Sequence, residues 1–140
     1  MTTMKEIEFI LYVGDQEKSK NFYQHVLGIT PHLHVPGMTE FELAEGVKLG
    51  LMPENGIARI LSDHVPHPRL GNGIPRCELY LKVENAETYL ERGFRAGAKK
   101  ISALQSRDWG DQVGYIADLD GHIIAFAESE RPTDEIESKE

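Results

Sequence analysis

Short runs of apolar residues with a period of two alternate along this chain with segments of helical spacing. Residues 6–13 are rich in β-forming residues, and the segment after them has the spacing of an amphipathic helix. Asp15 is suited to cap that helix and Gly28 to end it. The first half of the chain is therefore predicted to hold a strand at 6–13, a helix at 15–28 and strands at 29–35, 39–45 and 47–52.

The same order of patterns returns in the second half. It predicts a strand at 77–84, a helix at 85–99 and strands at 100–104, 112–118 and 122–128. Asn85 and Gly97 take the places of the capping residue and the terminating glycine of the first helix. Each half has the order βαβββ, so the repeat predicts an α+β fold of two tandem βαβββ modules that form a curved mixed sheet around a cleft.

The repeat divides the chain into four segments. They are a first module at 1–54, a linker or flap at 55–75, a second module at 76–128 and an acidic tail at 129–140. The linker is rich in proline and glycine and has no sustained period. The tail is charged and non-periodic, so we expect it to be loose.

Alternation also assigns the two faces of each opening strand. In the first strand Phe9, Leu11 and Val13 form an apolar face, which we expect to pack under the helix. The opposite faces mix acids with aromatic residues, and they carry Glu8 and Tyr12 in the first module and Glu78 and Tyr80 in the second. These side chains are predicted to line a small-molecule cleft, with an open, solvated sheet face as the alternative.

The composition argues against several classes of function. The chain has 140 residues and a net charge of −8, and its basic residues are scattered, which argues against a nucleic-acid surface. No segment has the length and apolarity of a membrane span, and the N-terminus lacks the pattern of a signal peptide. The single cysteine, Cys77, is expected to be a small buried side chain in a reducing compartment. We therefore expect a cytoplasmic protein that binds neither nucleic acid nor membrane.

Three segments carry a resemblance to a known superfamily. They read LYVGDQEKSKNFYQHVLGI, LYLKVENAETYLERGFRAGAK and GYIADLDGHIIAFAE, and their order and spacing cover most of residues 6–128. Together they resemble the vicinal oxygen chelate superfamily, which includes glyoxalase I, extradiol dioxygenases, fosfomycin-resistance enzymes and bleomycin-resistance proteins. The turn in the third segment is similar to the superfamily's aromatic-x-x-D-P-D-G-[HN] pattern, with Leu119 where proline is usual.

The resemblance implies where a metal would bind. Enzymes of this superfamily generally hold a divalent metal with ligands from the first and last strands of the modules, and these positions correspond to Glu8, Gly50, Glu78 and Ala125. Glycine and alanine have no ligand atom, so we expect no cofactor. The alternative is a divalent metal held by Glu8, Glu78 and a histidine in place of the missing ligand. If the alignment is right, a glutamate at position 125 should create metal affinity.

Histidines are the candidates for that replacement. His32 and His34 are two residues apart on a predicted strand, so we expect them to face the same way, and His34 is the candidate for lining the site. His64 and His67 belong to the predicted flap, where they are candidates for closing over a cleft. His122 is expected to order its turn.

Aromatic residues complete the predicted site. Trp109 and Tyr115 resemble the aromatic part of the cleft in the metal-free, antibiotic-binding branch of the superfamily, although a tryptophan that closes the end of a sheet is an equal alternative. We therefore expect a homodimeric, metal-independent protein that binds an aromatic or cationic small molecule, with antibiotic sequestration as one role. The alternatives are a metal-dependent lyase, isomerase or dioxygenase with a non-standard ligand set, and a sensing or scaffolding module.

Overall fold

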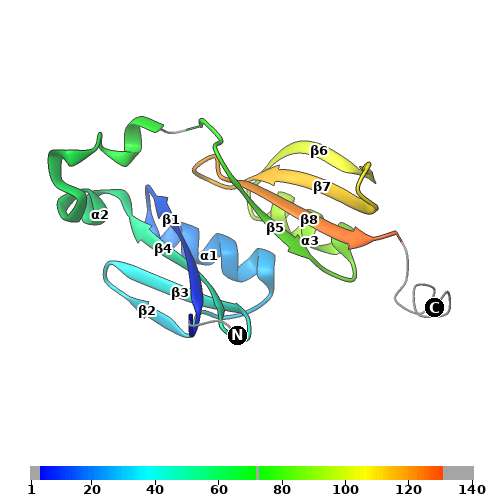
Figure 1. Cartoon of the computed structure of the whole chain (residues 1–140), viewed down its shortest axis with the longest axis horizontal. Coiled ribbons are helices and arrows are strands. Elements are labelled where there is room, and N and C mark those ends of the chain that lie inside the picture. Colours follow the sequence, from blue (N-terminus) through cyan, green and yellow to red (C-terminus); the bar gives the residue numbers. More distant parts are fainter. Residues whose placement is uncertain (1–3, 72, 131–140) are drawn as a thin grey trace. The chain divides into compact units, whose positions relative to one another are not determined.

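The computed structural model describes residues 4–71 and 73–130, and its elements repeat one order twice (Figure 1). The first unit holds β1 (Ile7–Val13), α1 (Gln16–Leu27), β2 (Leu33–Val35), β3 (Met38–Ala44) and β4 (Val47–Pro53). The second unit holds β5 (Glu78–Lys82), α3 (Ala86–Arg95), β6 (Lys99–Ser106), β7 (Asp111–Ala117) and β8 (Ile123–Ser129). The boundary between the two units falls between Ile74 and Pro75.

Both sheets have the same topology. Their strand orders are β1-β4-β3-β2 and β5-β8-β7-β6, and in each sheet the first and last strands of the module pair in parallel. The other neighbouring strands are antiparallel. The predicted α+β fold of two tandem βαβββ modules is therefore confirmed. The cleft that we expected between the modules stays a prediction.

The helices begin as their capping residues predict. A side-chain oxygen of Asp15 accepts a hydrogen bond from Lys18 N at 2.9 Å, and Gly28 ends α1 with a φ of 73°. The side-chain oxygen of Asn85 accepts a longer bond from Thr88 N at 3.4 Å at the start of α3. These bonds satisfy backbone N–H groups that a helix start leaves without partners.

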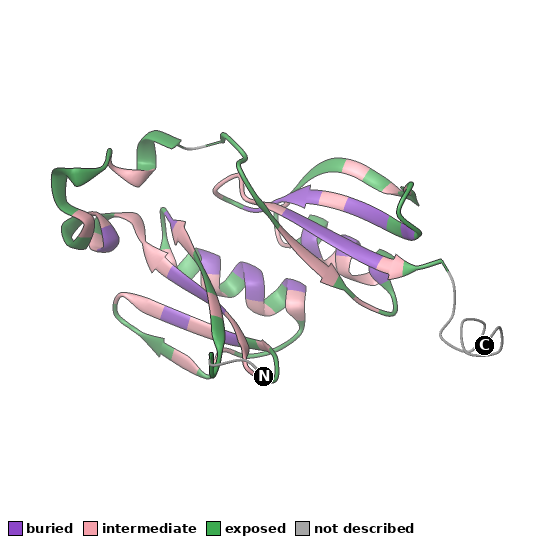
Figure 2. Cartoon of the chain, viewed as in Figure 1, coloured by how far each residue is buried: buried purple, intermediate pink, exposed green. Residues whose placement is uncertain are grey.

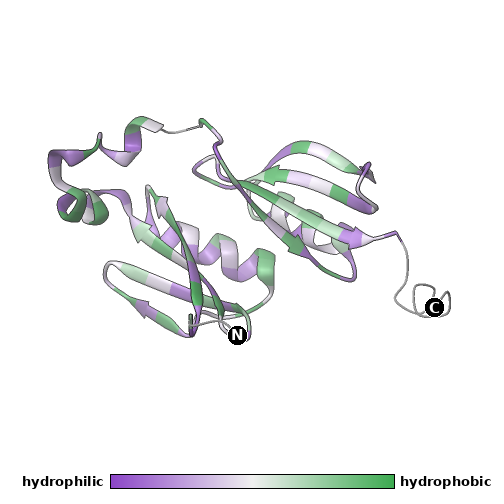
Figure 3. Ribbon diagram, viewed as in Figure 1, coloured by the Kyte–Doolittle hydropathy of each residue, from purple (hydrophilic) through white to green (hydrophobic). Residues whose placement is uncertain are grey.

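Each unit has a core between its helix and its sheet (Figure 2). Helix α1 covers β3 and β4, and α3 covers β7 and β8. The core side chains are Phe22, Tyr23, Val26, Phe41, Leu49 and Leu51 in the first unit, and Leu90, Ile116, Ile124 and Phe126 in the second. Strand β8 is hydrophobic over most of its length, as a central strand should be (Figure 3).

Strand β1 departs from the predicted burial. Val13 is buried as expected, but Phe9 is 53% exposed and Leu11 is only partly buried. The reason is the position of β1 at the edge of its sheet, since α1 packs on the neighbouring strands β3 and β4. The sequence pattern assigns the face of a side chain, whereas burial also depends on whether the strand is central.

The segment predicted as a linker contains regular structure. Helix α2 (Glu54–Leu61) follows β4 directly and buries Ile57, and short 3-10 helices follow at Ser62–His64 and Pro68–Gly71. Two turns of helix are too short for a clear period among so many prolines and glycines. No helix of the described residues is long and apolar enough to cross a membrane. The predicted tail lies outside the described residues beyond Glu130.

Cys77 was predicted to be buried, and this prediction is wrong. The side chain is exposed. Strand β5 begins only at Glu78, so Cys77 precedes the sheet and receives no cover from α3.

Candidate functional site

In the second unit the sheet face opposite α3 is aromatic. The register pairs Tyr80 of β5 with Ala125 of β8, and Ala125 with Tyr115 of β7, so the three side chains share this face. Ala125 is 0% exposed, and both tyrosines pack against the cluster that it forms with Val113 and Ala127. The position that the resemblance reserves for a metal carboxylate therefore holds a buried methyl group.

A chain of hydrogen bonds runs over this aromatic face. Trp109 donates from Nε1 to the hydroxyl oxygen of Tyr80 at 2.8 Å, and Tyr80 donates to Oδ2 of Asp111 at 2.5 Å. Nζ of Lys82 lies 3.4 Å from Oδ1 of Asp111, whose carboxylate is almost fully buried. Burial, followed by the hydrogen bond to Asp111, raises the pKa of Tyr80. The indole of Trp109 is thus held in place although it is 59% exposed.

Arg107 brings a positive charge to the same face. Its guanidinium carbon lies 5.2 Å from the centre of the Tyr115 ring. Nε and Nη2 donate to the carbonyl oxygen of Val113 at 3.2 and 2.8 Å. Nη2 also lies 2.9 Å from Ser102 Oγ and 3.2 Å from the carbonyl oxygen of Ala103. The pairing of β6 with β7 is irregular here, and the guanidinium binds backbone oxygens along the irregular stretch.

The sheet face opposite α1 in the first unit is acidic instead. The register places Glu8, Glu40 and Lys48 on this face. Oε1 of Glu40 lies 2.9 Å from Nε2 of His32 and 3.8 Å from Nζ of Lys48. Oε2 of Glu8 is buried and has no hydrogen-bond partner among the described residues. A Cβ added to Gly50 would lie 2.5 Å from this oxygen, so the Glu8 carboxylate occupies the space that Gly50 leaves.

The pKa values of Glu8 and Glu40 are shifted in opposite directions. Burial, together with the neighbouring Glu40 carboxylate, raises the pKa of Glu8. The hydrogen bond from His32 and the charge of Lys48 lower the pKa of Glu40. The surroundings of Glu8 therefore favour the protonated form of its carboxyl group more than water does.

Glu8→Gln is expected to stabilise the fold at pH 7. Folding raises the pKa of Glu8 above its value in the unfolded chain. At pH values above the unfolded pKa, the ionised carboxylate therefore lowers the free energy of unfolding, and this loss disappears as the pH falls and the group is protonated in both states. Urea unfolding at pH 7 and near pH 4 would measure the gain, which should shrink at the lower pH. Glu42→Gln, on the exposed part of β3, is the control. A gain that persists near pH 4 would contradict this explanation.

The donors do not fit the metal site that the resemblance implies. Gly50 and Ala125 have no ligand atoms, and the Glu8 carboxylate fills the space beside Gly50. Nζ of Lys48 lies 3.1 Å from Oε2 of Glu6 and 3.8 Å from Glu40, so an ammonium group already supplies positive charge to these acids. Within each unit, the residues at the implied positions supply one carboxylate only.

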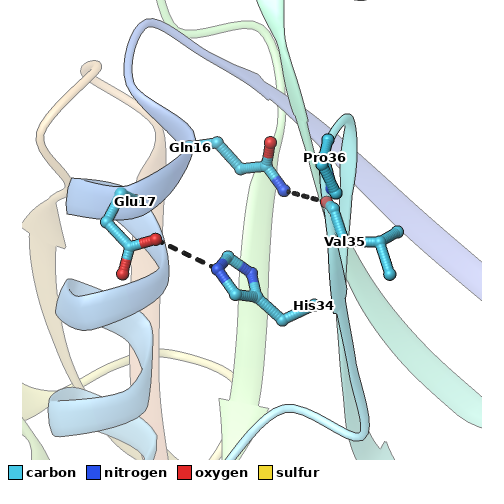
Figure 4. Close-up of a pocket in the computed structure, with 5 residues that line it drawn as sticks. All are labelled: Gln16, Glu17, His34, Val35 and Pro36. Atoms are coloured by element: carbon cyan, nitrogen blue, oxygen red, sulfur yellow. Dashed lines mark hydrogen bonds and ion pairs between the residues drawn. The ribbon is translucent and has the colours of Figure 1, made fainter.

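His34 does not lie beside Glu8. Its Nδ1 is 2.7 Å from Thr39 Oγ1 and its Nε2 is 3.0 Å from Oε1 of Glu17, so it faces α1 rather than the acidic face. It lines a pocket of about 270 Å³ between the start of α1 and β2 (Figure 4). Gln16 spans this pocket and donates to the carbonyl oxygen of Val35 at 2.8 Å. His34 is therefore unable to replace a missing ligand next to Glu8.

The prediction that His32 and His34 face the same way is wrong. His32 binds Glu40 on the acidic face, whereas His34 binds Glu17 on the helix side. Strand β2 begins at Leu33, and His32 lies in the bend before it, where strand alternation does not apply.

The other predicted site residues are more scattered. Glu78 is exposed at the start of β5, and Tyr12 is partly buried on β1 in the other unit. His67 has structural partners, since its Nε2 lies 3.0 Å from Asn55 Oδ1 and its Nδ1 accepts from Arg69 N at 3.1 Å. These contacts tie a 3-10 helix to α2.

His122 orders its turn, as expected. Oδ1 of Asp118 accepts hydrogen bonds from Asp120 N at 2.9 Å and His122 N at 2.8 Å. Oδ2 of Asp118 lies 2.8 Å from Nδ1 of His122. The ligand atoms of these three residues lie within 4.8 Å of one another, but the bonds within the turn account for the grouping.

Asp118→Ala is expected to lower the free energy of unfolding by about 2 kcal/mol, since the change removes a buried acceptor of several hydrogen bonds. Guanidinium unfolding would measure the loss. Asp108→Ala is the control because Asp108 is an exposed aspartate in another turn. Equal stability of the two variants would show that the Asp118 bonds contribute nothing net.

Sequence reasoning missed the partners of the predicted residues. Alternation within 39–45 places Glu40 and Glu42 on one face, and this signal could have identified Glu40. Asp111 and Arg107 flank Trp109 in the chain, but their contacts depend on a tight turn and an irregular strand pairing. No local pattern predicts those contacts.

The sequence and the fold of this chain are both similar to those of known proteins. A family model described as a glyoxalase-like domain matches residues 6–131. An uncharacterized protein of Mycobacterium bovis is 27% identical, and the alignment covers 91% of this chain and 87% of the relative. A crystal structure of a glyoxalase-related enzyme from Fulvimarina pelagi has a TM-score of 0.75 at 24% identity, covering 88% of this chain and 86% of that one. The crystal structure of a glyoxalase/bleomycin resistance protein/dioxygenase from Nocardioides has a TM-score of 0.69 at 22% identity, and the match covers 92% of this chain and 84% of that one.

Proposed function

This chain belongs to the glyoxalase-like domain family, within the vicinal oxygen chelate superfamily, and we propose that it binds a small aromatic molecule without a resident metal. The proposed site is the aromatic face of the second unit, formed by Tyr80, Trp109 and Tyr115. If the ligand is an antibiotic, the protein protects by sequestration, which requires no bond chemistry. Assembly as a homodimer remains our expectation, and light scattering after gel filtration would test it.

The exposed but fixed indole of Trp109 is the observation that carries this proposal. An exposed indole without a hydrogen bond is free to rotate, whereas this one is held by the Tyr80 hydroxyl, which Asp111 holds in turn. A ring that is already oriented loses less conformational freedom when a flat ligand stacks on it. The same face has Ala125 at the expected metal position, so aromatic contact is the chemistry that these side chains offer.

Fluorescence titration would test the proposal, because Trp109 is the only tryptophan of the chain. Naphthalene-2-carboxamide should quench this fluorescence saturably, with and without EDTA, and cyclohexanecarboxamide should bind more weakly. Trp109→Ala should weaken binding of the naphthalene probe by about tenfold in calorimetry, as expected for one lost stacking contact. Phe94→Ala is the control, since Phe94 is a 40% exposed aromatic residue on α3. Unchanged affinity in Trp109→Ala would reject this site.

A metal-dependent lyase, isomerase or dioxygenase is the competing function. The buried, unpartnered Oε2 of Glu8 favours it, because this oxygen is an unused acceptor close to Glu40. Metal analysis after exposure to Ni, Mn, Fe or Zn and exhaustive dialysis separates the two functions. Stoichiometric retained metal, accompanied by a raised melting temperature, would overturn metal-independent binding.

A further inference from the structure

Arg107 is a partly buried cation with no acidic partner in the part of the chain that the structure describes. Its Nε and Nη2 groups donate only to uncharged oxygens, those of two backbone carbonyls and one serine hydroxyl. No carboxylate among the described residues lies within ion-pair distance of it, and its neighbour Asp108 is exposed and unpaired with it. A guanidinium that is withdrawn from water usually has a counter-charge. This one has uncharged oxygens and the ring of Tyr115 instead.

The turn that carries Arg107 also carries Trp109. Arg107 N donates to the carbonyl oxygen of Asp111 at 2.9 Å, and Gly110, at a φ of 94°, donates to the carbonyl oxygen of Arg107 at 3.3 Å. From this short turn the guanidinium reaches the ring of Tyr115 and the indole reaches the hydroxyl of Tyr80. The cation and the exposed indole are thus presented together over one aromatic face.

Arg107 keeps free hydrogen-bond donors for a ligand. Its Nη1 has no hydrogen-bond partner among the described residues and is not among their buried, unpartnered atoms, so Nη1 is open to solvent. The charge of Lys82, on β5, is compensated by Asp111, whose Oδ1 lies 3.4 Å from the lysine Nζ. An anion on the ligand would therefore find its strongest partner in the guanidinium.

We infer that the ligand of this face is an aromatic carboxylate, whose ring stacks beside Trp109 and whose carboxylate binds Nη1 of Arg107. The inference rests on the proposed function and names its ligand class. The sequence predicted an aromatic or a cationic ligand, and this inference keeps the aromatic ring but replaces the positive charge with a negative one. Arg107 already covers the Tyr115 ring, so a cationic ligand would meet a like charge where it would otherwise find an aromatic surface.

A matched series of naphthalene probes tests the charge separately from the ring. Calorimetry with the full chain would compare naphthalene-2-carboxylate, naphthalene-2-carboxamide and 2-naphthylmethylammonium. The carboxylate should bind about tenfold more tightly than the carboxamide, the ammonium should bind most weakly, and added salt should reduce the difference. Binding of the carboxamide without any preference for the carboxylate would overturn the inference and leave the proposed function intact. Failure of all three probes to bind would overturn both.

Variants at position 107 test whether the guanidinium causes the tighter binding of the carboxylate probe. In Arg107→Gln the carboxylate-to-carboxamide affinity ratio should fall from about ten to about one. Arg107→Lys, which keeps the positive charge but replaces the planar guanidinium with a compact ammonium group, should retain part of the ratio and remains informative if the glutamine variant fails to fold. Lys99→Gln removes an exposed charge from β6 and should keep the full ratio. A ratio unchanged in both position 107 variants would refute the role of Arg107.

Discussion

Ala125→Glu is expected to lower the free energy of unfolding by about 3 kcal/mol and to create no metal affinity. The sequence alone predicted new metal affinity, because alignment places this residue where the superfamily carries a metal carboxylate. In the structure Ala125 is 0% exposed, with Tyr80 and Tyr115 packed against its cluster. A carboxylate at this position must either be buried without its hydration shell or push the rings of Tyr80 and Tyr115 aside. Urea unfolding and metal analysis after dialysis measure the two expectations.

The control for this change is Ile123→Glu. Ile123 is two residues earlier on the same face of β8 and is only partly buried, so a carboxylate there reaches solvent. Its loss of stability should be smaller than that of Ala125→Glu. If Ala125→Glu instead keeps the stability of the natural chain and retains one Ni or Zn per chain, the tyrosines move aside and the site accepts metal.

Tyr80→Phe is expected to cost about 2 kcal/mol of stability and to release Trp109. The change keeps the ring but removes the hydroxyl, which donates to a carboxylate that is 7% exposed and accepts from the indole. Asp111 would then keep only Lys82, at 3.4 Å. Urea unfolding measures the loss of stability. A shift of the Trp109 emission to longer wavelength would report the freed indole.

A second tyrosine provides the control for the hydroxyl. Tyr12 is partly buried on β1 and makes no hydrogen bond through its hydroxyl in the described structure, so Tyr12→Phe should be nearly neutral. In a double-mutant cycle, Tyr80→Phe and Asp111→Asn should be clearly non-additive, because each removes the same bond. Additive losses would mean that the short contact contributes no coupling energy.

The two modules share one topology but differ in chemistry at equivalent positions. Gly50 and Ala125 occupy the same place in the register of their sheets, two residues beyond the partners of Glu8 and Glu78. In the first module the glycine leaves room for a buried carboxylate, and in the second the alanine supports two aromatic rings. Neither position carries a ligand atom, and the side chains around each one differ.

The sequence by itself determined the repeat, the α+β class and the capping residues of α1 and α3, because these depend on local periodicity and on short-range hydrogen bonds. It also determined that positions 50 and 125 lack ligand atoms. Tyr80, Trp109 and Tyr115 were identified from the sequence as site candidates, and the structure brings them together on one face.

Only the tertiary structure decided which partners these residues have. His32 and His34 face opposite ways because β2 begins at Leu33, four residues later than the pattern indicated, and Phe9 is exposed because β1 is an edge strand. Glu40, Asp111 and Arg107 acquire their roles through strand register, a tight turn and an irregular pairing. Side-chain alternation follows from the geometry of a single strand, whereas a contact between strands depends on register, and register is set by turns and packing far away in the sequence.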